Sequence, residues 1–193
     1  MTPEPLPPAP LPPEPLPPAP RIAPVPPEDW DDDTAALLGA VGPLNLFTTM
    51  ANHPKLMKRW LVFGAHVLSK STLPAREREL AILRVGWRCG SDYEFGQHTL
   101  IGRDAGLSDD EIVRTTHDGL DGWSDDDAAL LAAADELVAE QRISDSTWSQ
   151  LSQRWSTEQL MDIVFTVGQY VTVCMALRTF GVQRDDGVPG FPA

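Results

Sequence analysis

Three titratable side chains in the middle of the chain stand at spacings that allow them to share one site. Glu79 precedes His98 by nineteen residues, and Glu94 precedes it by four. Two carboxylates and one imidazole in a cleft can pass protons between groups whose pKa values differ with burial and neighbouring charge. We therefore expect acid–base chemistry from Glu79, Glu94 and His98. The alternative is that Glu79 and His98 form a buried polar pair that fixes helix packing.

The sequence alone leaves the acid and the base of this set unassigned. Burial would raise the pKa of Glu79, whereas a protonated His98 beside it would lower that pKa. The two effects act in opposite directions, so either group is a candidate proton donor.

A helical hairpin would bring the three side chains to one cleft. Cys89-Gly90-Ser91 predicts a break between two helices, because glycine favours a helix end and serine suits the cap of the next helix. We expect antiparallel helices over residues 75–89 and 91–105.

The rest of the chain also has the helical period, and no convincing alternating strand is found, so we expect an all-α domain. Capping boxes begin at Ser108 and Ser156, and an acidic run follows Ser124. A stripe of Leu56, Trp60, Phe63 and Val67 gives the helix over residues 54–69 its apolar face. Further helices are expected over residues 33–41, capped by Asp33 or Thr34, and over 44–52, 124–141 and 144–154, with another that begins after Ser108. The long apolar segment 160–180, which follows the capping box at Ser156, is expected to be the buried central helix.

Proline divides the chain into two parts. The first 27 residues hold fourteen of the nineteen prolines, and the octapeptide PEPLPPAP occurs twice there. Such a segment cannot form a helix or a sheet ladder. We therefore expect a disordered proline-rich tail over residues 1–29 and a helical domain over residues 30–193. The tail is typical of a solvated spacer, with binding of its PxxP pattern to a protein partner as the alternative.

Composition excludes several classes of partner. The formal charge of −13 argues against nucleic acid and against an anionic membrane surface. No stretch approaches the roughly 18 apolar residues of a membrane-spanning helix.

Residues 1–25 lack the basic start and the unbroken apolar run of a secretory signal. Two cysteines are too few for a disulfide framework, so we expect a cytoplasmic protein.

Three blocks in fixed order carry a family resemblance. RERELAILRVG at residues 76–86, SDYEFGQH at 91–98 and AGLSDDEI at 105–112 resemble the carboxymuconolactone decarboxylase family, which shares a helical fold with the alkyl hydroperoxidase D proteins. The resemblance is weaker over residues 44–187 and leaves out the proline-rich start. It implies an alkyl hydroperoxidase D-like helical domain.

The resemblance also separates two branches of chemistry. In the peroxidase branch a glutamate, a CxxC pair and a histidine four residues after the second cysteine form the redox site. The glutamate and the histidine correspond to Glu79 and His98, while the two cysteine positions hold Ser91 and Glu94. Neither serine nor glutamate can form the sulfenate or disulfide that this route needs.

The decarboxylase-type branch implies loss of carbon dioxide from a small carboxylated unsaturated lactone, with no metal and no organic cofactor. On this hypothesis His98 donates the proton to carbon, and Glu79 and Glu94 orient it or exchange its proton. Three further side chains are candidates for substrate binding, namely Tyr93, Arg76 and Arg103.

Two other functions stay open. One is an alkyl hydroperoxidase D-like peroxidase or antioxidant protein with peroxiredoxin activity, which would have to use Cys89, because Cys174 lies in an apolar helix where an inert thiol is expected. The other is a non-catalytic oligomeric module that uses the proline-rich tail as a docking arm. Under every hypothesis the resemblance implies assembly into a homo-trimer or homo-hexamer.

Overall fold

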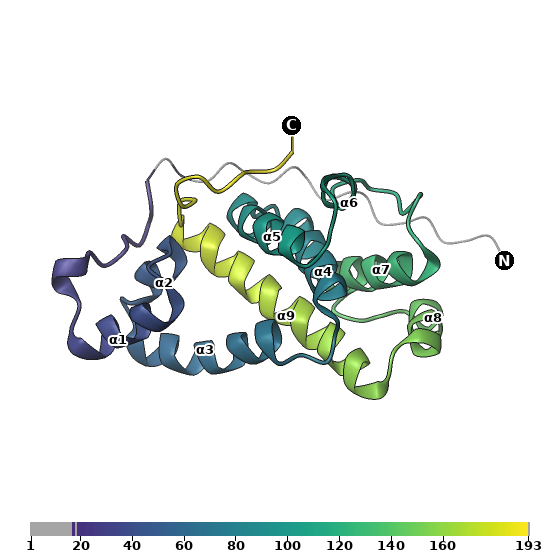
Figure 1. Ribbon diagram of the computed structural model, residues 1–193, viewed down its shortest axis with the longest axis horizontal. Coiled ribbons are helices and arrows are strands. Elements are labelled where there is room, and N and C mark those ends of the chain that lie inside the picture. The colour runs from purple at the N-terminus through teal and green to yellow at the C-terminus, as the bar shows by residue number, and fades with distance from the viewer. Residues whose placement is uncertain (1–16, 18, 193) are drawn as a thin grey trace.

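The computed structural model describes residue 17 and residues 19–192, and within this part of the chain every regular element is a helix (Figure 1). The prediction of an all-α fold is therefore confirmed. A short 3-10 helix, η1, spans Pro27–Asp29. The α-helices are α1 (Asp32–Val41), α2 (Asn45–Met50), α3 (Pro54–Ser69), α4 (Ala75–Arg88), α5 (Asp92–Asp104), α6 (Asp109–Arg114), α7 (Asp125–Glu140), α8 (Asp145–Arg154) and α9 (Thr157–Phe180).

Two helices form the centre of the fold. Helix α9 runs through the middle of the molecule, and α4 packs against it as well as against α5 and α7 (Figure 1). Residues 79–86 of α4 are all buried. Ile82 packs in a cluster with Val167 of α9, whereas Leu83 packs in a second cluster with Leu130 of α7. Helix α4 thus joins two apolar cores, so the groups it carries inward are shielded from water.

Local signals set most helix ends. Ser108 and Ser156 form capping boxes, and Ser124 accepts from the amide of Asp127, as predicted. The predicted cap of α1 is wrong, because Asp31 caps this helix rather than Asp33 or Thr34. The Oδ1 atom of Asp31 accepts from the amide of Thr34 at 2.7 Å, and this satisfies one of the free amides of the first turn.

The predicted break between the two hairpin helices is confirmed. Gly90 has a φ of 63°, in the left-handed region that glycine adopts without a steric penalty. Ser91 occupies the capping position of α5, but its side chain makes no capping hydrogen bond. Its Oγ atom is buried and has no hydrogen-bond partner among the described residues.

Part of the segment assigned to the disordered tail contacts the helical domain. The amide of Arg21 donates to the carbonyl of Phe180 at 2.7 Å, and the amide of Val25 donates to the carbonyl of Thr48 at 3.0 Å. The prediction of disorder is therefore wrong for residues 21–25, because backbone groups of this segment form hydrogen bonds with the helical domain. The predictions for residues 1–16 and 18 lie outside the described residues, and the division at residue 29 stays a prediction.

Helix α9 is less buried than the sequence predicts. By length and composition it could cross a membrane, although half of the apolar window is buried within the fold, as in the core helix of many globular proteins. The prediction that no stretch approaches a membrane-spanning helix in apolar content is therefore wrong for α9 by these two criteria. Met161 and Phe165 are 57% and 55% exposed, and Leu56 and Phe63 of the predicted α3 stripe are exposed as well.

Candidate active site

The hairpin of α4 and α5 brings the three predicted acid–base residues together. The Nδ1 atom of His98 lies 2.5 Å from Oε2 of Glu79, and its Nε2 atom lies 3.0 Å from Oε1 of Glu94. Glu79 is fully buried, and Glu94 and His98 are 3% and 5% exposed. The imidazole is therefore held between two carboxylates, one at each ring nitrogen.

The charge of this cluster favours a protonated imidazole. Burial lowers the pKa of His98, but the charges and hydrogen bonds of Glu79 and Glu94 outweigh burial and raise that pKa to about 9. At neutral pH the ring then carries a proton on each nitrogen. Because both nitrogens already face a carboxylate, a proton can leave the cluster only through one of the two glutamates or after one of them moves.

The two glutamates differ in how firmly they are held. Glu79 accepts from Nε of Arg78 at 3.1 Å in addition to its contact with His98. Within the described part of the chain, the carboxylate of Glu94 has one ion-pair partner, His98. Two neighbouring side chains therefore hold the carboxylate of Glu79 and one holds that of Glu94, so Glu94 is the freer end of the cluster.

Tyr170 of α9 covers the cluster. Its ring meets the ring of His98 edge to face, with the centroids 4.8 Å apart. Burial, together with the charges of Glu94 and Glu79, raises the pKa of Tyr170 well above its usual range. Tyr170 thus stays protonated and forms an apolar wall against the imidazole.

Tyr93, a predicted substrate-binding residue, points elsewhere. Its hydroxyl donates to Oδ2 of Asp185 at 2.6 Å and accepts from the amide of Leu46 at 3.2 Å. The side chain fastens the C-terminal segment to α2. Among the described residues, no side-chain hydrogen bond joins Tyr93 to the Glu79–His98–Glu94 cluster.

Arg76 and Arg103, the two arginines predicted to bind substrate, pair with acids outside the cluster. Their predicted position in the cleft is therefore wrong for this structure. Arg76 contacts Oε1 of Glu111 at 2.5 Å and Oδ1 of Asp127 at 3.0 Å. Both acids stand in first turns of helices, and their carboxylates attract this guanidinium. Arg103 pairs with Asp109 at 2.7 Å, and its side chain is 48% exposed.

A pocket of about 330 Å³ opens beside the hairpin turn. Cys89 lies at one side of it, and Cys174 and Arg178 of α9 line it as well. The Nη1 atom of Arg178 donates to the carbonyl oxygen of Cys89 at 2.9 Å. Cys89 raises the pKa of Cys174 most and burial adds to this, while the charge of Glu94 raises it further. Glu94 does not line the pocket.

Sequence reasoning missed the contribution of α9. Tyr170, Cys174 and Arg178 recur every fourth residue, so they share one face of the helix. A line of polarizable and charged groups on an otherwise apolar helix is the signal that could have pointed to them. Their register against His98 and Cys89 depends on tertiary packing, which the spacing does not contain.

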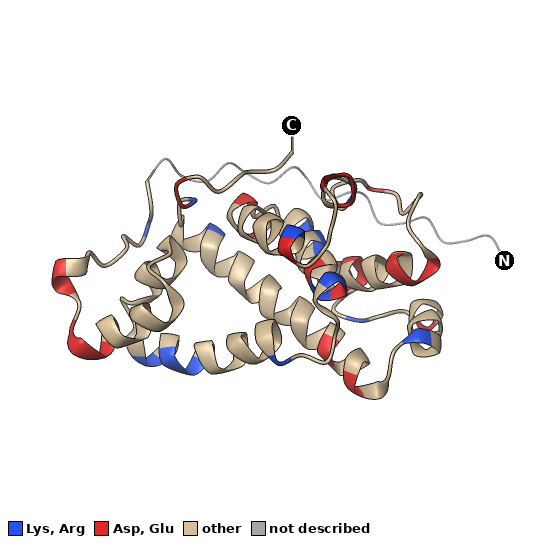
Figure 2. Cartoon of the chain, in the orientation of Figure 1, with Lys and Arg blue, Asp and Glu red and all other residues tan. Residues whose placement is uncertain are grey.

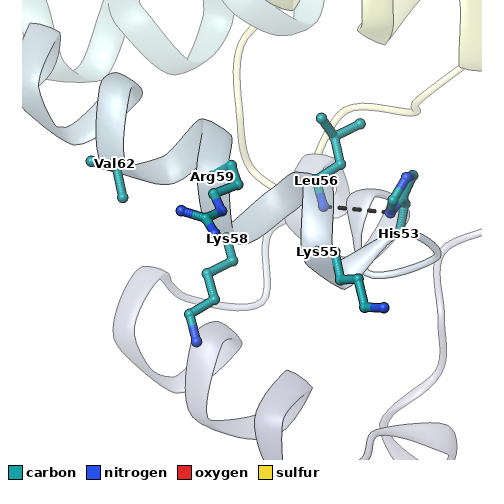
Figure 3. Close-up of a pocket in the computed structure, with 6 residues that line it drawn as sticks. All are labelled: His53, Lys55, Leu56, Lys58, Arg59 and Val62. Carbon is teal, nitrogen blue, oxygen red and sulfur yellow. Dashed lines mark hydrogen bonds between the residues drawn. The ribbon is translucent and has the colours of Figure 1, made fainter.

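A second hollow lies on α3 and has a different character. His53, Lys55, Lys58 and Arg59 line it with exposed side chains, and the amide of Leu56 donates to Nδ1 of His53 at 3.4 Å (Figure 3). Basic residues gather on α3, whereas acidic residues mark α1 and several helix starts (Figure 2). The hollow does not include the Glu79–His98–Glu94 cluster. Among the described residues, no group of three or more His, Cys, Asp and Glu side chains is placed to hold a metal ion.

These features define an all-helical protein with a buried Glu–His–Glu cluster between two antiparallel helices. Residues 54–136 match the model of the carboxymuconolactone decarboxylase family. This match agrees with the resemblance of the three sequence blocks. No curated protein matches the chain.

Solved structures share the fold at low sequence identity. The alkylhydroperoxidase AhpD core, an uncharacterized peroxidase-related protein from Ralstonia eutropha JMP134, is 18% identical with a TM-score of 0.76, over 86% of this chain and 92% of that one. The debrominase Bmp8 is 13% identical with a TM-score of 0.71, over 86% and 92%. An uncharacterized peroxidase-related protein from Silicibacter sp. TM1040 is 15% identical with a TM-score of 0.69, over 92% and 95%. The domain therefore has the AhpD-like fold.

Proposed function

We propose that the protein is an acid–base enzyme that decarboxylates or isomerises a small carboxylated lactone or a related acid, without a metal or organic cofactor. The observation that carries this proposal is the placement of His98 between Glu79 at 2.5 Å and Glu94 at 3.0 Å. A buried cation between two carboxylates can store a proton and release it without rearranging the core.

The two carboxylates have different roles in this proposal. Glu79 is fixed by Arg78 and keeps the imidazole oriented and charged. Glu94 is the proton carrier, because it is the freer end of the cluster and its charge acts on Cys174, which lines the pocket beside Cys89. His98 supplies the proton through Glu94, since neither ring nitrogen faces open space.

The substrate enters by the pocket beside Cys89. Arg178 lines this pocket and is the cation that a carboxylated substrate requires, a role that the positions of Arg76 and Arg103 do not favour. Val138 and Val171 supply the apolar part of the wall, which suits an unsaturated ring.

The chemical steps need only these groups. The bond between the ring carbon and the carboxylate carbon breaks, carbon dioxide leaves, and the electron pair stays in the unsaturated system of the lactone. Glu94 then delivers a proton to carbon and is recharged by His98. Arg178 holds the remaining carboxylate or the oxygen that gains negative charge.

The test is carbon dioxide release from a panel of carboxylated unsaturated lactones. For any lactone that wild type turns over, Glu94→Gln should lower kcat by about a hundredfold or more, the usual contribution of a positioned acid. Glu140→Gln is the matched control, because Glu140 is exposed at the end of α7. Release from none of the lactones, or turnover by Glu94→Gln at the wild-type rate, would refute the proposal.

A further inference from the structure

Arg178 lines the pocket beside Cys89 and is only half-buried. Its Nη1 atom donates to the carbonyl oxygen of Cys89 at 2.9 Å. Within the described part of the chain, no acidic side chain forms an ion pair with this guanidinium. A guanidinium binds a carboxylate through parallel, charge-assisted hydrogen bonds. The pocket therefore favours a ligand that carries a carboxylate.

The thiol of Cys89 faces the same pocket and is the accessible one of the two cysteines. Cys89 is partly exposed, whereas Cys174 is 1% exposed. A hydrogen bond from Cys174 lowers the pKa of Cys89, burial opposes this, and the charge of Arg178 lowers the pKa further. The thiolate is the nucleophilic form of cysteine. The pocket therefore also favours a ligand with an electrophilic carbon.

A conjugated unsaturated acid meets both demands, because it is an anion and its β-carbon is an electrophile. We propose that the sulfur of Cys89 adds to the β-carbon of an α,β-unsaturated lactone or acid while Arg178 pairs with the carboxylate of this substrate. The apolar side chains of Val138, Val171 and Met175 suit the carbon skeleton. The proposal rests on the proposed function for its class of substrate, and it names the nucleophile of the pocket.

The addition balances without an oxidant or a reductant. The thiol of Cys89 gives its proton to water, the thiolate attacks the β-carbon, a C–S bond forms, and the π bond between the two carbons breaks. The electron pair moves to the carbonyl oxygen as an enolate, and the α-carbon then takes one proton from water. Loss of that proton and expulsion of the thiolate reverse the reaction. Cys89 therefore binds the substrate covalently and is recovered as a thiol.

The first experiment uses the wild-type chain and a probe whose thiol adducts are stable. Reduced protein is mixed with a carboxylated α-methylene-γ-butyrolactone and digested with trypsin. Mass spectrometry should find one lactone on peptide 89–103, which carries Cys89, and none on peptide 155–178, which carries Cys174. The rate should saturate with lactone concentration, because binding to Arg178 precedes addition. No adduct at Cys89, equal labelling of both thiols, or a rate that rises linearly over the whole soluble range would overturn the proposal.

A neutral probe tests the role of Arg178. The parent α-methylene-γ-butyrolactone lacks the carboxylate, and the reaction with glutathione gives the intrinsic reactivity of each lactone. After this correction, wild type should prefer the carboxylated lactone by about tenfold or more, the effect of one hydrogen bond to a charged group. Arg178→Gln should lose the preference, and Arg178→Lys, which keeps a cation, should retain part of it. Arg142→Gln is the matched control, since the side chain of Arg142 is 73% exposed. A wild type without the preference would refute the proposal.

A further variant identifies the nucleophile. Cys89→Ser should form no adduct, whereas Thr172→Ala, which changes an exposed residue of α9, should react as wild type does. An adduct on Cys89→Ser at the wild-type rate would refute the proposal. Carbon dioxide release is measured separately on the panel of carboxylated lactones. Adducts without any release would refute the acid–base function and support the thiol addition, whereas release without an adduct would refute the thiol addition alone.

Discussion

The Nδ1 atom of His98 lies 2.5 Å from Oε2 of Glu79, across the turn that joins α4 to α5. This contact links the two helices of the hairpin through buried charge. The carboxylates of Glu79 and Glu94, Arg78 beside Glu79, and the ring of Tyr170 surround the imidazole. The protonation of His98 is therefore coupled to the stability of the fold.

Stability should fall as the pH rises through the pKa of His98. The folded pKa of about 9 lies above the ordinary value of 6.5, so the stabilisation is complete below pH 6.5 and is lost as the pH passes 9. It amounts to roughly 3 kcal/mol, at about 1.4 kcal/mol for each pKa unit. Urea unfolding at pH 6, 7.5 and 9 should show the difference between wild type and His98→Gln narrowing with pH. His117→Gln, an exposed control, should follow wild type, and a constant difference for His98→Gln would contradict the assignment.

Removing the carboxylate of Asp135 should lower the free energy of unfolding, because this carboxylate pairs with the buried guanidinium of Arg84. Arg84 is fully buried and forms two contacts of 2.7 Å with Asp135, which also binds Arg88. Asp135→Ala leaves a buried cation without its carboxylate, so we expect a loss of about 3–5 kcal/mol in urea unfolding. Asp118→Ala removes an 80% exposed partner of Arg88 and should change stability by less than about 1 kcal/mol. Equal effects of the two substitutions would show that Asp135 is not the critical partner.

Helix ends were the most predictable part of the fold, because each depends on a few neighbouring residues. Ser108, Ser124 and Ser156 cap their helices as their local patterns predict, and Gly90 supplies the turn between α4 and α5. The grouping of Glu79, Glu94 and His98 follows from the same turn, since an antiparallel hairpin fixes which residues face each other.

Contacts between distant segments were beyond sequence reasoning. Arg76 stands one helical turn before Glu79, yet acids of α6 and α7 hold it away from His98. Cys174 lies beside Cys89 because α9 packs on α4, and no local pattern encodes that register. Ser91 sits at a capping position, but its hydroxyl is turned into the core.

Gly96 should be needed for docking of the C-terminal segment on α5. A Cβ atom at this position would overlap the carbonyl oxygen of Pro189, a backbone group that cannot rotate away. Gly96→Ala should therefore displace this segment, which Asp185 otherwise ties to Tyr93, and destabilise the fold by about 1–3 kcal/mol. Limited proteolysis should show faster cleavage after Arg184. Gly168→Ala is the control, since nothing lies within 4 Å of a Cβ there. Unchanged proteolysis of Gly96→Ala would show that the segment can shift without cost.

Assembly into a trimer or hexamer should depend on the apolar face shared by α3 and α9. Phe63 and Phe165 meet edge to face with centroids 6.1 Å apart, and Val62 and Met161 beside them are 73% and 57% exposed. A contiguous exposed apolar patch is typical of an interface. Phe165→Glu should therefore convert the oligomer to monomers in native mass spectrometry, because a carboxylate in an apolar contact is costly to desolvate. Val113→Glu places the same charge on α6, at a residue 42% exposed, and should leave the oligomer intact. A monomeric wild type would contradict assembly itself, and an intact Phe165→Glu oligomer would place the interface on another face.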